Sequence, residues 1–121
     1  MLRYFQRLIF LIRLPKGEFK LGELILLLVV QRCVALRDSY SLNKILAWRF
    51  KIIYLSKIRE SLVSKNYVTT TLVKAVHHYS ITDIGIDYLN KNYDTLIKTL
   101  LAKYPEQKEF IDAVVSNRSQ L

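Results

Sequence analysis

The feature that most constrains the fold is a helix that is apolar on nearly all sides. It runs from about Lys20 to Leu36 and contains Leu24–Val30, an unbroken run of seven apolar residues. A helix without a polar face has to be buried, so we expect it at the centre of the domain. The run is bounded by Glu23 and Gln31-Arg32 and is far shorter than the roughly 20 apolar residues that span a bilayer. The sequence therefore predicts a buried core helix and no transmembrane segment.

A basic segment precedes this helix. Residues 2–13 have the spacing of an amphipathic helix, which Pro15-Lys16-Gly17 is expected to end. Its apolar core, Leu8–Ile12, has five residues and is followed by Arg13 without a small-residue cleavage site, so we expect no signal peptide. Its apolar side needs a partner surface, which is the protein's own core, a second copy of the chain, or a membrane interface.

Two shorter helices are predicted after the central one. Asp38-Ser39-Tyr40-Ser41 is a polar break that ends in an N-cap residue, Ser41, and the helix that follows reaches about Arg49. Residues 50–53 are expected to form a turn before a helix from about Tyr54 to Lys65. The side chains expected to face the core are Leu42, Ile45, Leu46 and Trp48 in the first of these helices, and Leu55, Ile58, Leu62 and Val63 in the second.

The apolar period then changes twice. Residues 66–72 and 75–82 are rich in β-branched and aromatic residues, which predicts a hairpin that turns near Val73-Lys74. A long helix is expected from Asp83 to about Lys103, with an apolar seam for another helix of the same chain or of a second copy. Pro105 separates it from a last helix that ends at about Ser116. The seam residues are Ile86, Leu89, Tyr93, Leu96 and Leu100, and those of the last helix are Phe110, Ile111, Val114 and Val115.

The net charge of +9 is confined to the N-terminal half of the chain. Residues 1–20 hold five basic and one acidic residue, residues 21–66 hold eight and three, and residues 67–121 hold six of each. Such asymmetry indicates a polyanionic partner, either nucleic acid or an anionic membrane surface. A soluble basic protein without such a partner has the same composition, so charge alone leaves these interpretations open.

Side chains that would support catalysis or metal binding are sparse. Cys33 is the single cysteine, and its apolar neighbours indicate a core residue, which fits a reducing cytoplasm. His77 and His78 are expected on opposite faces of a strand, without a further ligand at metal-binding spacing. We find no phosphate-binding loop, no glycine-rich dinucleotide turn and no nucleophile with a base. We therefore expect no enzymatic activity, no metal and no cofactor.

The order of the predicted elements resembles a winged helix-turn-helix domain. The segment from Leu62 to Val68 is similar to the end of a recognition helix that enters the wing. The segment from Tyr79 to Leu89 is similar to the aromatic, aliphatic, Thr, Gly and Leu pattern that closes the wing in MarR-like and PadR-like transcriptional regulators. In that pattern Thr82 caps the next helix and Gly85 permits a close approach. The chain departs from the family in its apolar turn and in a wing tip whose only cation is Lys74.

The resemblance implies a cytoplasmic homodimer that regulates transcription by sequence-specific binding to double-stranded DNA. One recognition helix per subunit would enter successive major grooves, about 34 Å apart. The implied fold is mainly α with a small β-hairpin, divided into an N-terminal arm (1–19), a DNA-binding core (20–82) and C-terminal dimerisation helices (83–121).

The resemblance also implies which side chains contact DNA. They are Tyr54, Ser56, Lys57, Arg59 and Glu60 on the recognition helix, with Ser61 and Ser64 as further candidates; Lys44, Arg49 and Lys51 on phosphates; and Lys74 and His77 on the wing.

Alternatives to this function remain open. The polar side of residues 54–65 is equally compatible with an ordinary solvated helix face. A winged-helix scaffold also suits a non-catalytic adaptor or assembly factor that contacts protein through residues 2–13 and 86–104. A third hypothesis is a membrane-surface protein anchored by residues 2–13.

Overall fold

The computed structural model describes residues 16–116, and this part of the chain is mainly helical with one two-stranded antiparallel sheet. Its α-helices are α2 (Lys16–Arg32), α3 (Ser39–Lys44), α4 (Leu55–Ser64), α5 (Asp83–Lys103) and α6 (Lys108–Ser116). The short turns η1 (Val34–Leu36), η2 (Ile45–Arg49) and η3 (Pro105–Gln107) and the strands β1 (Val68–Val73) and β2 (Val76–Ile81) complete it. A mainly α fold with a small β-hairpin is thus confirmed, whereas the helix expected at 2–13 lies outside the described residues.

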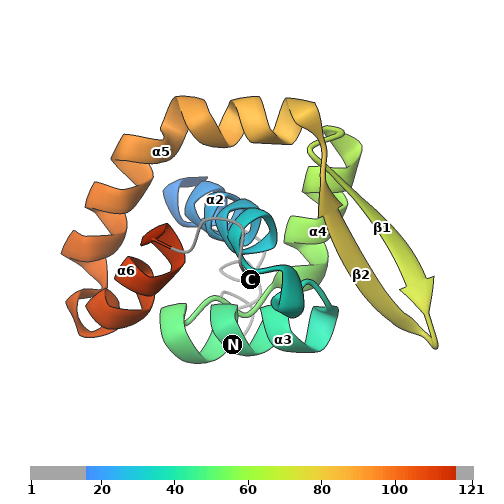
Figure 1. The fold of residues 1–121 in the computed structure, drawn as a ribbon, viewed down its shortest axis with the longest axis horizontal. Coiled ribbons are helices and arrows are strands. Elements are labelled where there is room, and N and C mark those ends of the chain that lie inside the picture. The colour runs from blue at the N-terminus through green and yellow to red at the C-terminus, as the bar shows by residue number, and fades with distance from the viewer. Residues whose placement is uncertain (1–15, 117–121) are drawn as a thin grey trace, which may run out of the picture.

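Helix α2 lies at the centre of the structure, and the other helices surround it (Figure 1). Every residue from 21 to 30 is buried, which confirms the central helix. The predicted bounds were wrong at both ends. Lys16 and Gly17 belong to the first turn of α2, so the helix begins within the Pro15-Lys16-Gly17 segment that was expected to be a break. Cys33 leaves the helical conformation at φ −124° and ψ 81°, and Arg37 Nε then donates to the free Val30 carbonyl at 2.6 Å.

Asp38, and not Ser41, is the N-cap of α3. Its carboxylate accepts hydrogen bonds from the Ser41 backbone N–H (3.0 Å) and hydroxyl (2.8 Å). Helix α3 continues into η2, a π-helical turn with wider spacing than an α-helix. Leu42, Ile45 and Leu46 are buried as predicted, but Trp48 is 75% exposed, so its expected place in the core is wrong. The π-helical turn offers the reason, because it displaces residue 48 from the apolar side that the α-helical period predicts.

The segment between η2 and α4 alternates between buried and exposed residues. Phe50 and Ile52 are 1% and 0% exposed, and only Lys51 between them takes a left-handed φ, 60°. Gly22 on α2 makes room for this segment and for α4, since a Cβ there would lie 2.7 Å from Ile58 Cδ1. Helix α4 buries Leu55, Ile58 and Leu62 as predicted, whereas Val63 is 43% exposed.

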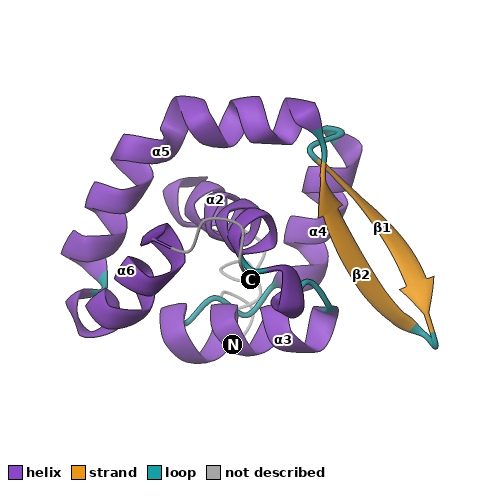
Figure 2. Cartoon of the chain, viewed as in Figure 1, coloured by secondary structure: helices purple, strands orange, loops and turns teal. Residues whose placement is uncertain are grey.

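The predicted hairpin is present at the edge of the helical part (Figure 2), with a register from Val68↔Ile81 to Val73↔Val76. Its two-residue turn, Lys74-Ala75, has both residues left-handed, at φ 52° and 67°. The hairpin is tied to the segment before α3, because the Tyr79 N–H donates to the Arg37 carbonyl at 2.9 Å. A bridge between Asp38 and His78 lies beside that bond.

The junction between the hairpin and α5 is as predicted. The Thr82 hydroxyl accepts a hydrogen bond from the Gly85 N–H (2.9 Å) and donates to the Asn66 carbonyl (2.7 Å). Gly85 is buried against the backbone of Tyr67, where any Cβ would collide with the Tyr67 carbonyl. The apolar seam of α5, including buried Leu89, Leu96 and Leu100, belongs to the same core cluster as α2, and α5 packs against α2 of the same chain.

Candidate nucleic-acid interface

A groove of about 550 Å³ lies between α3, the start of α4 and the turn of the hairpin. We call it the α4 groove. It contains four of the residues that the sequence analysis selected, namely Tyr54, Ser56, Lys57 and Arg59. His77, a further wing candidate, also lines it. The remaining lining residues are Ser39, Tyr40, Asn43, Ile53, Leu55, Ala75 and Val76.

Helix α4 presents Ser56 and Lys57 to solvent because its opposite face is fixed in the core. Leu55, Ile58 and Leu62 are at most 7% exposed, and they set the rotation of the helix. Ser56, Lys57 and Glu60 are consequently exposed. Arg59 is half-buried, and its Nη1 lies 3.5 Å from the Tyr79 hydroxyl, which holds it toward the hairpin. A hydroxyl and two cations therefore project from one helix beside the hairpin.

The C-terminal end of α4 is held by a buried carboxylate on α2. Glu23 on α2 is 2% exposed and accepts a hydrogen bond from the Ser61 hydroxyl at 2.6 Å. Lys65 Nζ lies 3.1 Å from the same carboxylate oxygen. Ser61, a further candidate for DNA contact, thus directs its hydroxyl toward α2, while Ser64 is exposed.

Tyr54 lines the groove and also packs against α2. Its ring stacks on Phe19 with centroids 5.9 Å apart, and its hydroxyl is buried with no hydrogen-bond partner among the described residues. Burial, together with the negative charge of Glu18, raises the pKa of Tyr54 to about 12. The buried hydroxyl faces inward, although Tyr54 is one of the residues that line the groove.

The other selected residues lie elsewhere. Lys44 and Arg49 line a second groove, described below, on the side of α3 and η2 that faces η3 and α6. Lys51, Glu60 and Lys74 are exposed but line neither groove. The structure thus brings Tyr54, Ser56, Lys57 and Arg59 together and places Lys44 and Arg49 apart from them.

Sequence reasoning missed the apolar rim of the α4 groove. Tyr40 is 71% exposed and Ile53 is 75% exposed, and both line the groove. The polar break was expected to be only a loop and residues 50–53 only a turn. The one available signal was position, and it applies only to Ile53, which lies two residues before α4.

The positive charge beside the α4 groove has no ion-pair partner within residues 16–116. Within residues 16–116 the ion pairs are Lys65–Glu23 and Lys108–Asp112, and neither involves a cation of this groove. Lys57 and Arg59 are therefore free of carboxylate partners among the described residues. An uncompensated cation next to a hydroxyl on an exposed helix suits a phosphate or a base edge.

The two histidines lie as their sequence positions predict. His77 lines the α4 groove and is partly buried, whereas His78 is exposed. In the described part of the chain, no group of three His, Cys, Asp or Glu side chains is arranged to hold a metal ion. Cys33 is buried, and burial raises the pKa of its thiol, in agreement with a core position.

Comparison of the chain with protein-family models, with curated proteins and with solved structures found no match. None of the helices in the described ranges has the length and apolarity needed to cross a bilayer. The geometry of the α4 groove is therefore the basis on which a function can be proposed.

Proposed function

We propose that residues 16–116 contain a winged helix-turn-helix domain that binds double-stranded DNA through the α4 groove. In this proposal α3 and α4 are the helix-turn-helix pair, and β1 and β2 are the wing. Support comes from the element order, from the bond between the Tyr79 N–H and the Arg37 carbonyl, and from the tight turn of the chain at Thr82 and Gly85. The observation that carries the function is the solvent-facing side of α4, where Ser56 and Lys57 are exposed beside the hairpin.

The dimensions of α4 suit a DNA major groove. A ten-residue helix is about 15 Å long and about 10–12 Å wide with its side chains, and the major groove is about 12 Å wide. In this orientation Ser56 and Lys57 face base edges, and Arg59 reaches a phosphate. Lys51 and Lys74, both exposed, add phosphate contacts that supply affinity without sequence preference.

The proposal includes a non-catalytic transcriptional regulator that acts in the cytoplasm as a homodimer. One recognition helix contacts few base pairs, and regulators of this kind gain specificity by placing two helices on adjacent half-sites. Because α5 uses its apolar seam against α2, the second copy has to bind another surface.

Salt-dependent DNA binding tests the proposal. We expect Lys57→Ala with Arg59→Ala to weaken binding to duplex DNA and to flatten the dependence of log K on log salt, by about one unit for each phosphate that is no longer neutralised. The matched control is Lys91→Ala with Lys98→Ala, which removes the same charge from exposed positions on α5 and should have a much smaller effect. Equal affinity and equal salt dependence for the two double variants would show that α4 does not contact the DNA.

A protein-binding adaptor is the second candidate, and exposed apolar side chains favour it. Tyr40 and Ile53 on the rim of the α4 groove are both largely exposed. Exposed apolar surface of this kind is a feature of protein interfaces as well as of contacts to thymine methyl groups. If the chain binds no duplex at low salt and elutes as a stable oligomer, the adaptor function replaces DNA binding.

A further inference from the structure

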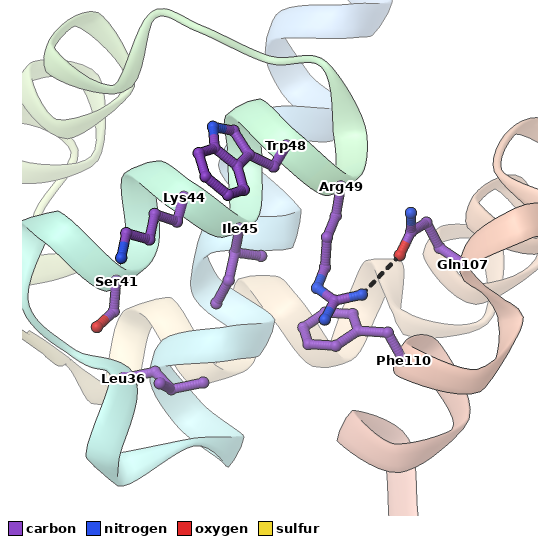
Figure 3. A pocket seen from close by; sticks show the side chains of 8 residues that line it. All are labelled: Leu36, Ser41, Lys44, Ile45, Trp48, Arg49, Gln107 and Phe110. Carbon is purple, nitrogen blue, oxygen red and sulfur yellow. Dashed lines mark hydrogen bonds between the residues drawn. The ribbon is translucent and has the colours of Figure 1, made fainter.

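A second groove, of about 530 Å³, separates α3 and η2 from η3 and α6 (Figure 3). We call it the Trp48 groove. Its lining residues are Leu36, Ser41, Lys44, Ile45, Trp48, Arg49, Gln107 and Phe110. None of these residues lines the α4 groove, so a ligand here does not need the α4 groove; Lys44 and Arg49 are the two candidate DNA contacts that the fold places here instead.

Trp48 is the most unusual component of this groove. It is the single tryptophan of the chain and is 75% exposed, although a buried tryptophan would contribute strongly to the core. It belongs to the π-helical turn η2, and such turns are frequent at functional sites. In Figure 3 its ring stands on the same helical segment as Lys44, about one turn away.

Arg49 is held in position at the opposite wall. Its Nη1 donates to Gln107 Oε1 at 2.9 Å, and its guanidinium lies 4.2 Å from the centroid of the Phe110 ring. Only one donor of five is used by Gln107, so other N–H groups are available to an acceptor. Because Gln107 and Phe110 already fix the side chain, binding an anion costs little further side-chain entropy.

The groove combines two cations with an apolar floor and has no acidic lining residue. Neither Lys44 nor Arg49 forms an ion pair with a carboxylate of the described residues. Leu36 and Ile45 supply aliphatic surface between them. A sugar-phosphate backbone satisfies the cations but leaves the aliphatic and aromatic surface without a partner. The chemistry of the groove therefore calls for a ligand that is both acidic and apolar.

We propose that the Trp48 groove binds an acidic amphipathic segment of a partner protein. Trp and Arg are the residue types that most often dominate the binding energy of protein interfaces, and a partly apolar groove is the usual receptor of an amphipathic helix. Aspartate or glutamate of the partner would pair with Lys44 and Arg49, and an aliphatic or aromatic side chain would cover Trp48 and Ile45. The chain's own residues 1–15 hold three arginines and no carboxylate, so like charges oppose that segment as the occupant.

Peptide selection on the full chain tests this inference. A phage-displayed library of random peptides is selected on the wild-type protein after depletion on Trp48→Ala, a change at an exposed site that should leave the fold intact. We expect the recovered peptides to combine Asp or Glu with apolar residues. Because Trp48 is the single tryptophan, each synthetic peptide should change its fluorescence on binding.

Charge reversal then identifies the contacts. Lys44→Glu with Arg49→Glu should weaken a recovered acidic peptide by about tenfold or more, and the same peptide with its acids changed to lysine should regain binding to that variant. Lys57→Ala, in the α4 groove, is the control and should bind the peptide like the wild type. Circular dichroism of each variant confirms the fold. Recovery of no Trp48-dependent peptide, or only of peptides without acidic residues, overturns the inference, as does binding of the acidic peptide that charge reversal leaves unchanged.

Discussion

The Ser61 hydroxyl on α4 donates a 2.6 Å hydrogen bond to the carboxylate of Glu23 on α2. Glu23 is the buried charged residue of the described core, with 2% exposure. Lys65 also reaches this carboxylate, at 3.1 Å, from a side chain that is 46% exposed. The orientation of α4, and with it the position of Ser56 and Lys57, thus depends on a polar contact inside the core as well as on apolar packing.

We predict that Ser61→Ala destabilises the protein more than Lys65→Ala does. Removing the hydroxyl leaves a buried carboxylate short of a donor, which costs about 1.5–3 kcal/mol. The half-exposed lysine is screened by solvent, so its loss costs less than about 1 kcal/mol. Urea unfolding of the two variants measures both free energies. An equal loss for the two would mean that the ion pair holds α4 as strongly as the hydroxyl does and would contradict the prediction.

Gly85→Ala should be strongly destabilising. A Cβ at this position collides with the Tyr67 backbone carbonyl, which cannot move without disturbing the start of the hairpin. We expect a loss of at least about 1–3 kcal/mol, the usual cost of overpacking. Gly17→Ala is the matched control, because a Cβ there meets nothing within 4 Å and the substitution should be neutral or stabilise α2. Thermal unfolding of both variants tests the contrast, which would vanish if the backbone near Tyr67 relaxed freely.

Ala75→Gly should stabilise the hairpin. Ala75 has a φ of 67°, and the left-handed conformation costs a residue with a Cβ roughly 1–2 kcal/mol. Glycine removes most of that cost, partly offset by its greater freedom in the unfolded chain, so we expect a net gain of about 0.5–1 kcal/mol. Ala102→Gly, at an exposed position of α5, is the opposite control and should lose about 0.5–1 kcal/mol. Urea midpoints that shift in the same direction for both would contradict this interpretation.

Tyr54→Phe should change how the free energy of unfolding depends on pH above pH 10. The pKa of Tyr54 is raised from 10.0 to about 12, so the folded state holds this proton more tightly than the unfolded chain. Stability linked to Tyr54 is therefore complete below pH 10 and is lost as the pH rises toward about 12. We expect the phenylalanine variant to lose less stability over this range than the wild type.

At neutral pH the same variant should be as stable as the wild type or more stable by up to about 1 kcal/mol, because the buried hydroxyl makes no hydrogen bond of good geometry among the described residues, although Glu18 lies near it. Unfolding by urea at several pH values gives both results. A marked loss at neutral pH would show that the hydroxyl is hydrogen-bonded in solution.

Local sequence signals predicted much of the fold correctly. The start of α5 depends on a hydrogen bond between Thr82 and Gly85, three positions apart, and the hairpin follows from the β-branched residues of its two strands. The same signals failed where another part of the chain decides the conformation. The N-cap moved to Asp38, whose strand-like contact with His78 comes from the hairpin, and Trp48 turned outward on a π-helical turn that the α-helical period does not anticipate.

The candidate sites depended even more on tertiary structure. The sequence placed the candidate DNA contacts in one set, but the fold divides them between two grooves and the open surface. Arg49 is directed by Gln107 and Phe110, and the hydrogen bond to Gln107 spans 58 positions of the chain. Contacts with residues so distant in the sequence do not affect the pattern of apolar and polar residues around Arg49, so that pattern cannot predict them.

The sequence by itself determined the buried central helix, because a segment without a polar face can be stable only inside the protein. It also determined the order of the elements around that helix, since apolar period and capping residues act over a few positions. Only the tertiary structure decided that Glu23 inside that helix would hold Ser61, and that Lys44 and Arg49 would lie apart from Lys57 and Arg59. Burial and electrostatic contact depend on distance in space, and the fold sets that distance independently of separation along the chain.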